Sequence, residues 1–173
     1  MEQRPFAVRY GPLIGGLAVI FALDQYTKFL VRQNFDLYES VPVIQGFFNL
    51  TYITNKGAAF GFMSGTDGPW IGRFFILFSI FAIILVIFIY REVEKDDKAL
   101  KTALILILSG AVGNLADRFY AGKVTDFLDF HIGSYHWPAF NVADSCITIG
   151  VILIIASWTY SEAVKKKTNK KEP

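Results

Sequence analysis

The chain has one cysteine, Cys146, and only two histidines among its 173 residues. A single cysteine cannot form an internal disulfide, so we expect a fold without covalent cross-links. Motifs of several common enzyme classes are also missing: there is no H-E-x-x-H for zinc, no G-x-S-x-G for a serine nucleophile and no G-x-x-x-x-G-K-[ST] for phosphate. These absences argue against a zinc peptidase, a hydrolase with a serine elbow and a P-loop enzyme.

Charged residues are scarce as well, at 18%, whereas 53% of the chain is hydrophobic and the mean hydropathy is +0.40. This composition is typical of a polytopic membrane protein rather than a soluble domain. Four apolar runs are each near the ~20 residues that cross a bilayer as a helix. They lack the alternation of a membrane β-barrel. We predict helices at about 11–32, 70–90, 98–119 and 138–160 in a single domain of residues 1–164.

Two longer connections separate these helices, at 33–69 and 119–137. The first contains an aromatic and β-branched run around Phe47–Ile53 that predicts one or two strands. Its later part, Gly57–Gly68, combines glycines with large apolar residues, which predicts a mobile lid able to lie on a membrane. We interpret 119–137 as a loop, with Pro138 in the first turn of the fourth helix.

Basic residues predict the orientation of the helices. Of 17 lysines and arginines, 11 lie before the first helix, from the end of the second helix to the start of the third, and in the tail 165–173. The positive-inside rule therefore places both termini and the basic tail in the cytoplasm. The connections 33–69 and 119–137 are then on the outer side. Because the basic residues flank helices, they indicate topology rather than nucleic-acid binding.

Two carboxylates are the most informative polar residues. Asp126 lies in Val124–Phe127, and Asp144 lies at the mouth of the fourth apolar run. A charge beside hydrocarbon persists only where it is paired, hydrated or used. Two acids held close share one proton, so that one can act as a general base on water while the other donates a proton. This chemistry is that of an aspartic protease, expected here at a membrane.

Other polar residues have simpler interpretations. Asp24 and Lys28 have the i, i+4 spacing of a helix-stabilising ion pair. Asn114, Asp117 and Arg118 share one face at the end of the third helix, and for Asn114 interhelical hydrogen bonding is an alternative to a catalytic role. Asp129 either competes with Asp126 for the catalytic role or is solvated in the loop.

Two further catalytic arrangements remain to be weighed. His131 and His136 lie near several carboxylates, but their spacing fits no zinc motif, so we expect no metal. A Ser–Lys dyad would have to use Lys28 with Ser109 or Ser145, and no motif supports it.

Five segments, in this order and on this helix pattern, resemble the lipoprotein signal peptidases, also called signal peptidase II. They are Asp24–Lys28, Asn55–Phe60, Gly113–Arg118, Val124–Phe127 and Phe140–Ser145. The resemblance covers nearly the whole chain. It implies an α-helical polytopic membrane protein with four transmembrane helices, a small extracytoplasmic β-cradle and a membrane-lying lid segment.

The resemblance also implies the activity and the site. The family removes the signal peptide from diacylglyceryl-modified prolipoproteins, cutting before the lipidated cysteine, without a cofactor or metal. Asp126 and Asp144 match its catalytic pair. The positions matching its substrate-binding and supporting residues are Asp24, Lys28, Asn55, Gly57, Asn114, Arg118 and Asn141. We therefore expect a monomer in the bacterial cytoplasmic membrane, in contact with lipid, with its site at the outer face.

Two other classes of protein remain as alternatives. A four-helix transporter could use Asp126 and Asp144 as proton-relay groups, although the chain has no repeat of broken helices. A structural membrane scaffold would leave the two acids at the outer interface unexplained. An assay with a lipidated precursor discriminates between the enzyme and the transporter. Cleavage of the precursor supports the enzyme, whereas solute flux without cleavage supports the transporter.

Overall fold

The computed structural model describes residues 6–57, 69–94 and 96–169. This part of the chain contains four long helices: α1 (Phe6–Asn34), α2 (Pro69–Glu92), α3 (Lys98–Ala121) and α4 (Val142–Asn169). Each helix includes a stretch long and apolar enough to cross a membrane. The predicted four-helix fold is therefore confirmed.

The fourth helix differs from the expected 138–160 at both ends. It begins at Val142, because Phe140 still pairs with a strand and Asn141 then caps the helix. Pro138 thus precedes α4 instead of forming its first turn. At the other end α4 continues to Asn169, so the first part of the expected basic tail is helical.

Helix α3 is the centre of the bundle and packs against α1, α2 and α4. In its apolar stretch 39% of the residues are buried, against 11% in α2 and in α4. Glycines permit the close packing of α3: a Cβ at Gly110 would strike the backbone of Ala143, and a Cβ at Gly113 would strike Asp24. The outer face of α2 is highly exposed, as at Leu77 (67%). Such a surface suits contact with lipid.

A small antiparallel sheet has the strand order β1 (Ser40–Ile44), β2 (Phe48–Asn55), β3 (Val124–Ile132) and β4 (Tyr135–His136). Strands β1 and β2 confirm the cradle expected between the first two helices. The expectation of a loop at 119–137 was wrong, since this segment forms β3 and β4. β3 pairs with β2, whose residues are distant in sequence, so local pattern alone gave a weak signal for it.

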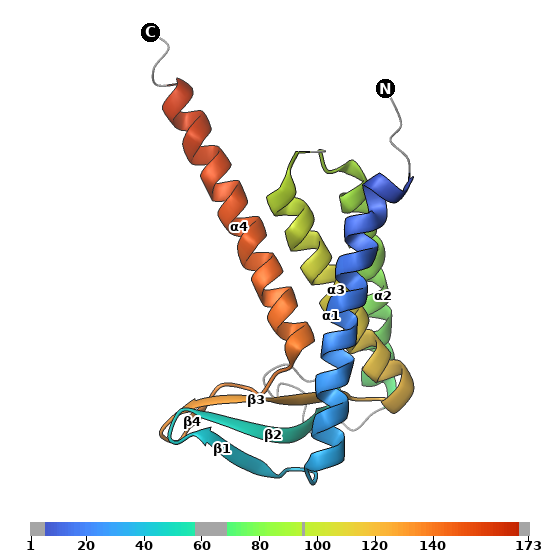
Figure 1. The fold of residues 1–173 in the computed structure, drawn as a ribbon, viewed down its shortest axis with the longest axis vertical. Coiled ribbons are helices and arrows are strands. Elements are labelled where there is room, and N and C mark those ends of the chain that lie inside the picture. The colour runs from blue at the N-terminus through green and yellow to red at the C-terminus, as the bar shows by residue number, and fades with distance from the viewer. Residues whose placement is uncertain (1–5, 58–68, 95, 170–173) are drawn as a thin grey trace.

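The sheet lies across one end of the helix bundle, and the start of α1 and the end of α4 lie at the opposite end (Figure 1). Strand β3 follows α3 and leads through β4 to α4, so its residues come close to the ends of both helices. Most of the segment predicted as a lid, residues 58–68, lies outside the described residues.

Candidate active site

Asp126 lies on β3, just after the chain leaves α3. Only 3% of its surface is exposed, and its Oδ1 accepts a hydrogen bond of 2.7 Å from Asn141 Nδ2. Because side chains alternate along a strand, Asp126 faces α4 while Thr125 and Phe127 point to the other face of the sheet. The sheet therefore carries this carboxylate to the mouth of α4.

Asp144 is held at the N-terminus of α4 by a reciprocal cap. Asn141 Oδ1 accepts a bond of 3.0 Å from the backbone N–H of Asp144, and Asp144 Oδ2 accepts one of 3.3 Å from the backbone N–H of Asn141. This arrangement is a capping box, in which each side chain satisfies a free N–H of the first turn. The helix dipole also favours a negative charge at this end.

Two asparagine amides connect the two carboxylates. Asn114 Nδ2 donates to Asp144 Oδ1 over 2.7 Å, and Asn114 Oδ1 accepts from Asn141 Nδ2 over 3.2 Å. The same Asn141 nitrogen donates to Asp126. The amides thus hold the two acids in one hydrogen-bonded chain drawn from β3, α3 and α4, and the structure brings together the pair predicted from sequence.

The fully buried ammonium group of Lys28 contacts the Asn114 end of this hydrogen-bonded chain. Lys28 is 0% exposed and lies 2.9 Å from Asp24 Oδ2 and 3.1 Å from Asp117 Oδ2. It also donates to Asn114 Oδ1 over 3.0 Å. The predicted Asp24–Lys28 ion pair is therefore present. All three N–H groups of Lys28 have acceptors, so it is not placed as the base of a Ser–Lys dyad.

Asp24 also links the first helix to the fourth. Its Oδ1 accepts a bond of 2.9 Å from the backbone N–H of Ala143, in the first turn of α4. Its Oδ2 accepts from Gln25 Nε2 over 3.0 Å. A buried carboxylate is costly unless it is paired and hydrogen-bonded, and Asp24 meets both conditions. It consequently fixes the position of the turn that carries Asp144.

Asp117 is a buried residue whose importance the sequence analysis missed. Besides Lys28, it lies 3.6 Å from Arg32 and accepts a bond of 3.1 Å from the backbone N–H of Thr125, next to Asp126. Its spacing of i+3 from Asn114 placed it on the polar face of the third helix. However, spacing within one helix gives no information on contacts with α1 and β3.

Burial, and next the neighbouring carboxylate of Asp144, raises the pKa of Asp126 from its ordinary value of 3.8 to about 7. Hydrogen bonds from Asn141 and Asn55 and the charge of Lys28 oppose this rise. A carboxyl group with a pKa near 7 exchanges its proton readily at neutral pH. The pair is therefore suited to general acid–base chemistry.

Two further predicted residues, Arg118 and Gly57, lie against Phe75 of α2. The guanidinium of Arg118 lies over the ring of Phe75, 5.4 Å from its centroid. Arg118 Nη1 also donates to the backbone carbonyl of Asn114 over 3.3 Å. The backbone N–H of Gly57 donates to Asn55 Oδ1 over 2.8 Å. Gly57 has a φ of +126° and faces Phe75 so closely that a Cβ would clash.

Asp129 is neither solvated nor beside Asp126. It is 7% exposed and accepts hydrogen bonds from Asn49 Nδ2 (3.0 Å), while one oxygen lies 2.8 Å from His136 Nδ1. Three positions separate it from Asp126 along β3, so the two carboxylates point to opposite faces of the sheet. The expectation of a solvated loop residue was wrong, and Asp129 instead ties β2, β3 and β4 together.

The imidazole rings of His131 and His136 stack on each other, with their centroids 4.6 Å apart. Among the described residues, no group of three or more His, Cys, Asp or Glu side chains is placed to hold a metal ion.

Two linked acids, one with a pKa near 7, thus lie at the end of an apolar helix bundle, an arrangement suited to a peptidase at a membrane. Comparisons with known proteins give the family. Residues 17–160 match the model of signal peptidase (SPase) II. The chain therefore belongs to the signal peptidase II family, and it is an aspartic endopeptidase of a bacterial membrane.

Individual relatives are similar in sequence to this protein over most of its length. The lipoprotein signal peptidase of Desulforapulum autotrophicum is 51% identical over 79% of this chain and 85% of its own. That of Syntrophus aciditrophicus is 46% identical over 85% of this chain and 91% of its own. A solved bacterial membrane enzyme structure at 2.3 Å resolution superposes with a TM-score of 0.78 and 34% identity, covering 100% of this chain and 98% of the other.

Proposed function

We propose that this protein removes signal peptides from prolipoproteins whose cysteine carries diacylglycerol, and that it cuts the peptide bond before that cysteine. The observation that carries the proposal is the hydrogen-bonded chain from Asp126 through Asn141 and Asn114 to Asp144. The family and the lipoprotein signal peptidases that resemble this chain supply the substrate class.

The proposed reaction needs one proton shared by the two acids. Both acids accept two hydrogen bonds, but only Asp144 lies at a helix N-terminus, where the helix dipole favours its ionised form. We therefore assign the resting proton to Asp126, whose pKa is about 7. Asp144 then removes a proton from water as the resulting hydroxide attacks the scissile carbonyl carbon.

Asp126 donates its proton to the carbonyl oxygen in the same step. In the tetrahedral diol that results, Asp144 passes the proton it took from water to the amide nitrogen, and the C–N bond breaks. Asp126 recovers a proton from the diol hydroxyl, which becomes the new carboxyl group. Both acids return to their starting states, and no covalent enzyme intermediate forms.

The remaining polar residues act by positioning. We propose that Asn114 and Asn141 orient the pair, that the Lys28 cluster holds the start of α4 in place, and that Asn55 and Arg118 face the substrate. Positioning lowers the activation free energy substantially when the reacting groups are held near their reacting geometry. The lipid anchor of the substrate would add to this by holding the scissile bond at the membrane surface.

The proposed orientation has both termini in the cytoplasm and the sheet at the outer face of the cytoplasmic membrane. It rests on the basic residues of the helix ends and on the location of the sheet opposite the start of α1 and the end of α4 (Figure 1). In this orientation Asp126 and Asp144 lie at the outer surface, where a translocated precursor presents its signal-peptide junction.

The test uses the purified full chain and a precursor that carries the diacylglyceryl group. We expect mass spectrometry to find one cut, which leaves the lipidated cysteine as the new N-terminus. Asp126→Asn and Asp144→Asn should each abolish the cut, and the double variant should be little worse. Asp129→Asn is the matched control, since it changes another buried acid of the same strand. Near-normal cleavage by a folded Asp126→Asn or Asp144→Asn variant would refute the proposal.

A further inference from the structure

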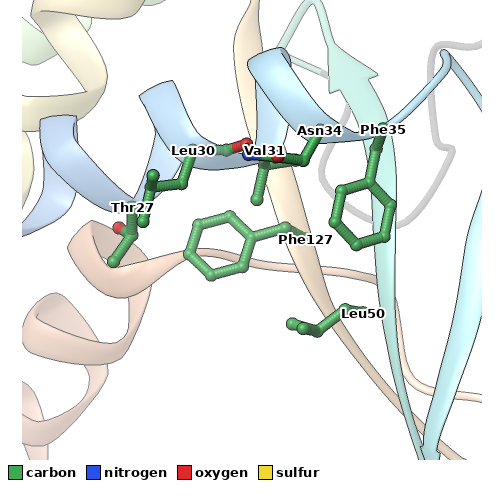
Figure 2. A pocket seen from close by; sticks show the side chains of 7 residues that line it. All are labelled: Thr27, Leu30, Val31, Asn34, Phe35, Leu50 and Phe127. Carbon is green, nitrogen blue, oxygen red and sulfur yellow. Dashed lines mark hydrogen bonds between the residues drawn. The ribbon is translucent and has the colours of Figure 1, made fainter.

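A pocket of about 320 Å³ lies between the end of α1 and the sheet, apart from the two acids. Figure 2 shows α1 side chains along one wall and side chains of the two central strands facing them. Its apolar lining consists of Leu30, Val31, Phe35, Leu50 and Phe127. Nothing in the proposed reaction uses this space.

The two polar residues of the lining direct their donors elsewhere. Thr27 Oγ1 lies 2.9 Å from the backbone carbonyl of Leu23 and 2.9 Å from that of Asp24. Asn34 Nδ2 donates over 2.7 Å to the carbonyl of Leu30. These donors are therefore used within α1. A concave site with an almost wholly apolar lining favours an apolar guest. Its chemistry selects a hydrocarbon.

The pocket is continuous with the lipid-facing surface of α1. Leu23 and Tyr26 are exposed there, and Leu30, which is 40% exposed, belongs both to that surface and to the pocket. The apolar span of α1 ends at Asn34, which also lines the pocket. The pocket thus lies where the helix reaches the edge of the hydrocarbon, within reach of a lipid chain.

We propose that this pocket binds one acyl chain of a bilayer phospholipid, which fills the gap between α1 and the sheet. The occupant is bilayer lipid rather than substrate because Phe127 and Asp126 are adjacent on β3 and so point to opposite faces of the sheet. A substrate held at Asp126 would have to pass its chain around the strand. The bound chain supports the face of β3 behind Asp126.

The test measures lipid retention by the full chain, without any catalytic readout. The protein is purified in mild detergent, titrated with dioleoyl phosphatidylcholine and analysed by native mass spectrometry. We expect one phospholipid to be retained more tightly than the rest. Its affinity should rise with acyl chain length until the pocket is full, because a longer chain makes more packing contacts with the lining.

Leu30→Trp should lower the affinity for this lipid about tenfold, because the indole fills the pocket from its rim. Leu23→Trp is the matched control: it makes the same change on the same lipid-facing surface about two turns earlier, outside the pocket. Leu50→Phe fills the pocket from the sheet and should act like Leu30→Trp. Thermal melts establish that each variant is folded, and added lipid should raise the melting temperature of the wild type more than that of the filled variants.

Equal retention by Leu30→Trp and Leu23→Trp would overturn the proposal, as would an affinity that is independent of chain length. Displacement of the retained phospholipid by a lipidated precursor would assign the pocket to substrate and overturn it as well. An Asp126→Asn variant should bind the lipid normally, so failure of the proposed catalytic pair is distinguishable from failure of this site.

Discussion

Replacing Asp126 by asparagine should stabilise the folded protein at neutral pH while it abolishes cleavage. The side chain is 3% exposed, and burial and Asp144 raise its pKa from 3.8 to about 7. The folded state therefore binds this proton more tightly than the unfolded state does. Between about pH 4 and pH 7 the folded protein holds more protons at this site, so stability falls as the pH rises.

The size of the effect follows from the two pKa values. A rise from 3.8 to about 7 corresponds to a loss of about 4 kcal/mol on going from below pH 4 to above pH 7, at about 1.4 kcal/mol per pKa unit. Asparagine cannot ionise, and its carbonyl oxygen can still accept the bond from Asn141 Nδ2. The variant should therefore gain up to about 4 kcal/mol over the wild type above pH 7, or up to roughly 8–16 °C in melting temperature.

The assay is a series of thermal melts in detergent from pH 4 to pH 9. The difference in melting temperature between Asp126→Asn and the wild type should be smallest near pH 4, increase through pH 7 and then level off. Asp144→Asn removes the neighbouring charge, so the Asp126 titration in that variant should move to lower pH. A difference that stays constant across the whole range would refute the reasoning.

The remaining predictions concern the supports of the site, the orientation and the metal. Lys28→Met should destabilise the protein by about 3–5 kcal/mol in chemical unfolding, because it leaves buried carboxylates without their cation; wild-type stability would contradict the network. Gly57→Ala should lower cleavage more than tenfold in a folded protein, as its φ of +126° and its contact with Phe75 leave no room for a methyl group; unchanged turnover would count against it. In a Cys146→Ala background, single cysteines at the exposed positions of Ile132 and Tyr135 should react with an impermeant maleimide from outside whole cells, and labelling of residues 91–94 from outside would contradict the proposed topology. EDTA should leave turnover unchanged, and activity lost on chelation and restored by zinc would sink the metal-free mechanism.

Local patterns in the sequence predicted the helices because each apolar run is long enough to cross a bilayer alone. The Asp24–Lys28 ion pair could also be predicted from the sequence, since i, i+4 contacts depend only on helix geometry. The start of α4 was misplaced because it depends on pairing of Phe140 with β3, a contact that no helix signal records. The roles of Asp117 and Asp129 were missed because their partners lie on other elements.

The sequence by itself determined the membrane class, the resemblance to signal peptidase II and the two acids as its candidate pair, because composition, run length and ordered motifs are properties of the chain. Tertiary structure alone decided how the site is built. It showed that Asn141 both caps α4 and bonds Asp126, and that Lys28 joins Asp24 and Asp117. These contacts link residues from separate elements, and their formation depends on the close approach of α3 to its neighbours and on the β2–β3 pairing.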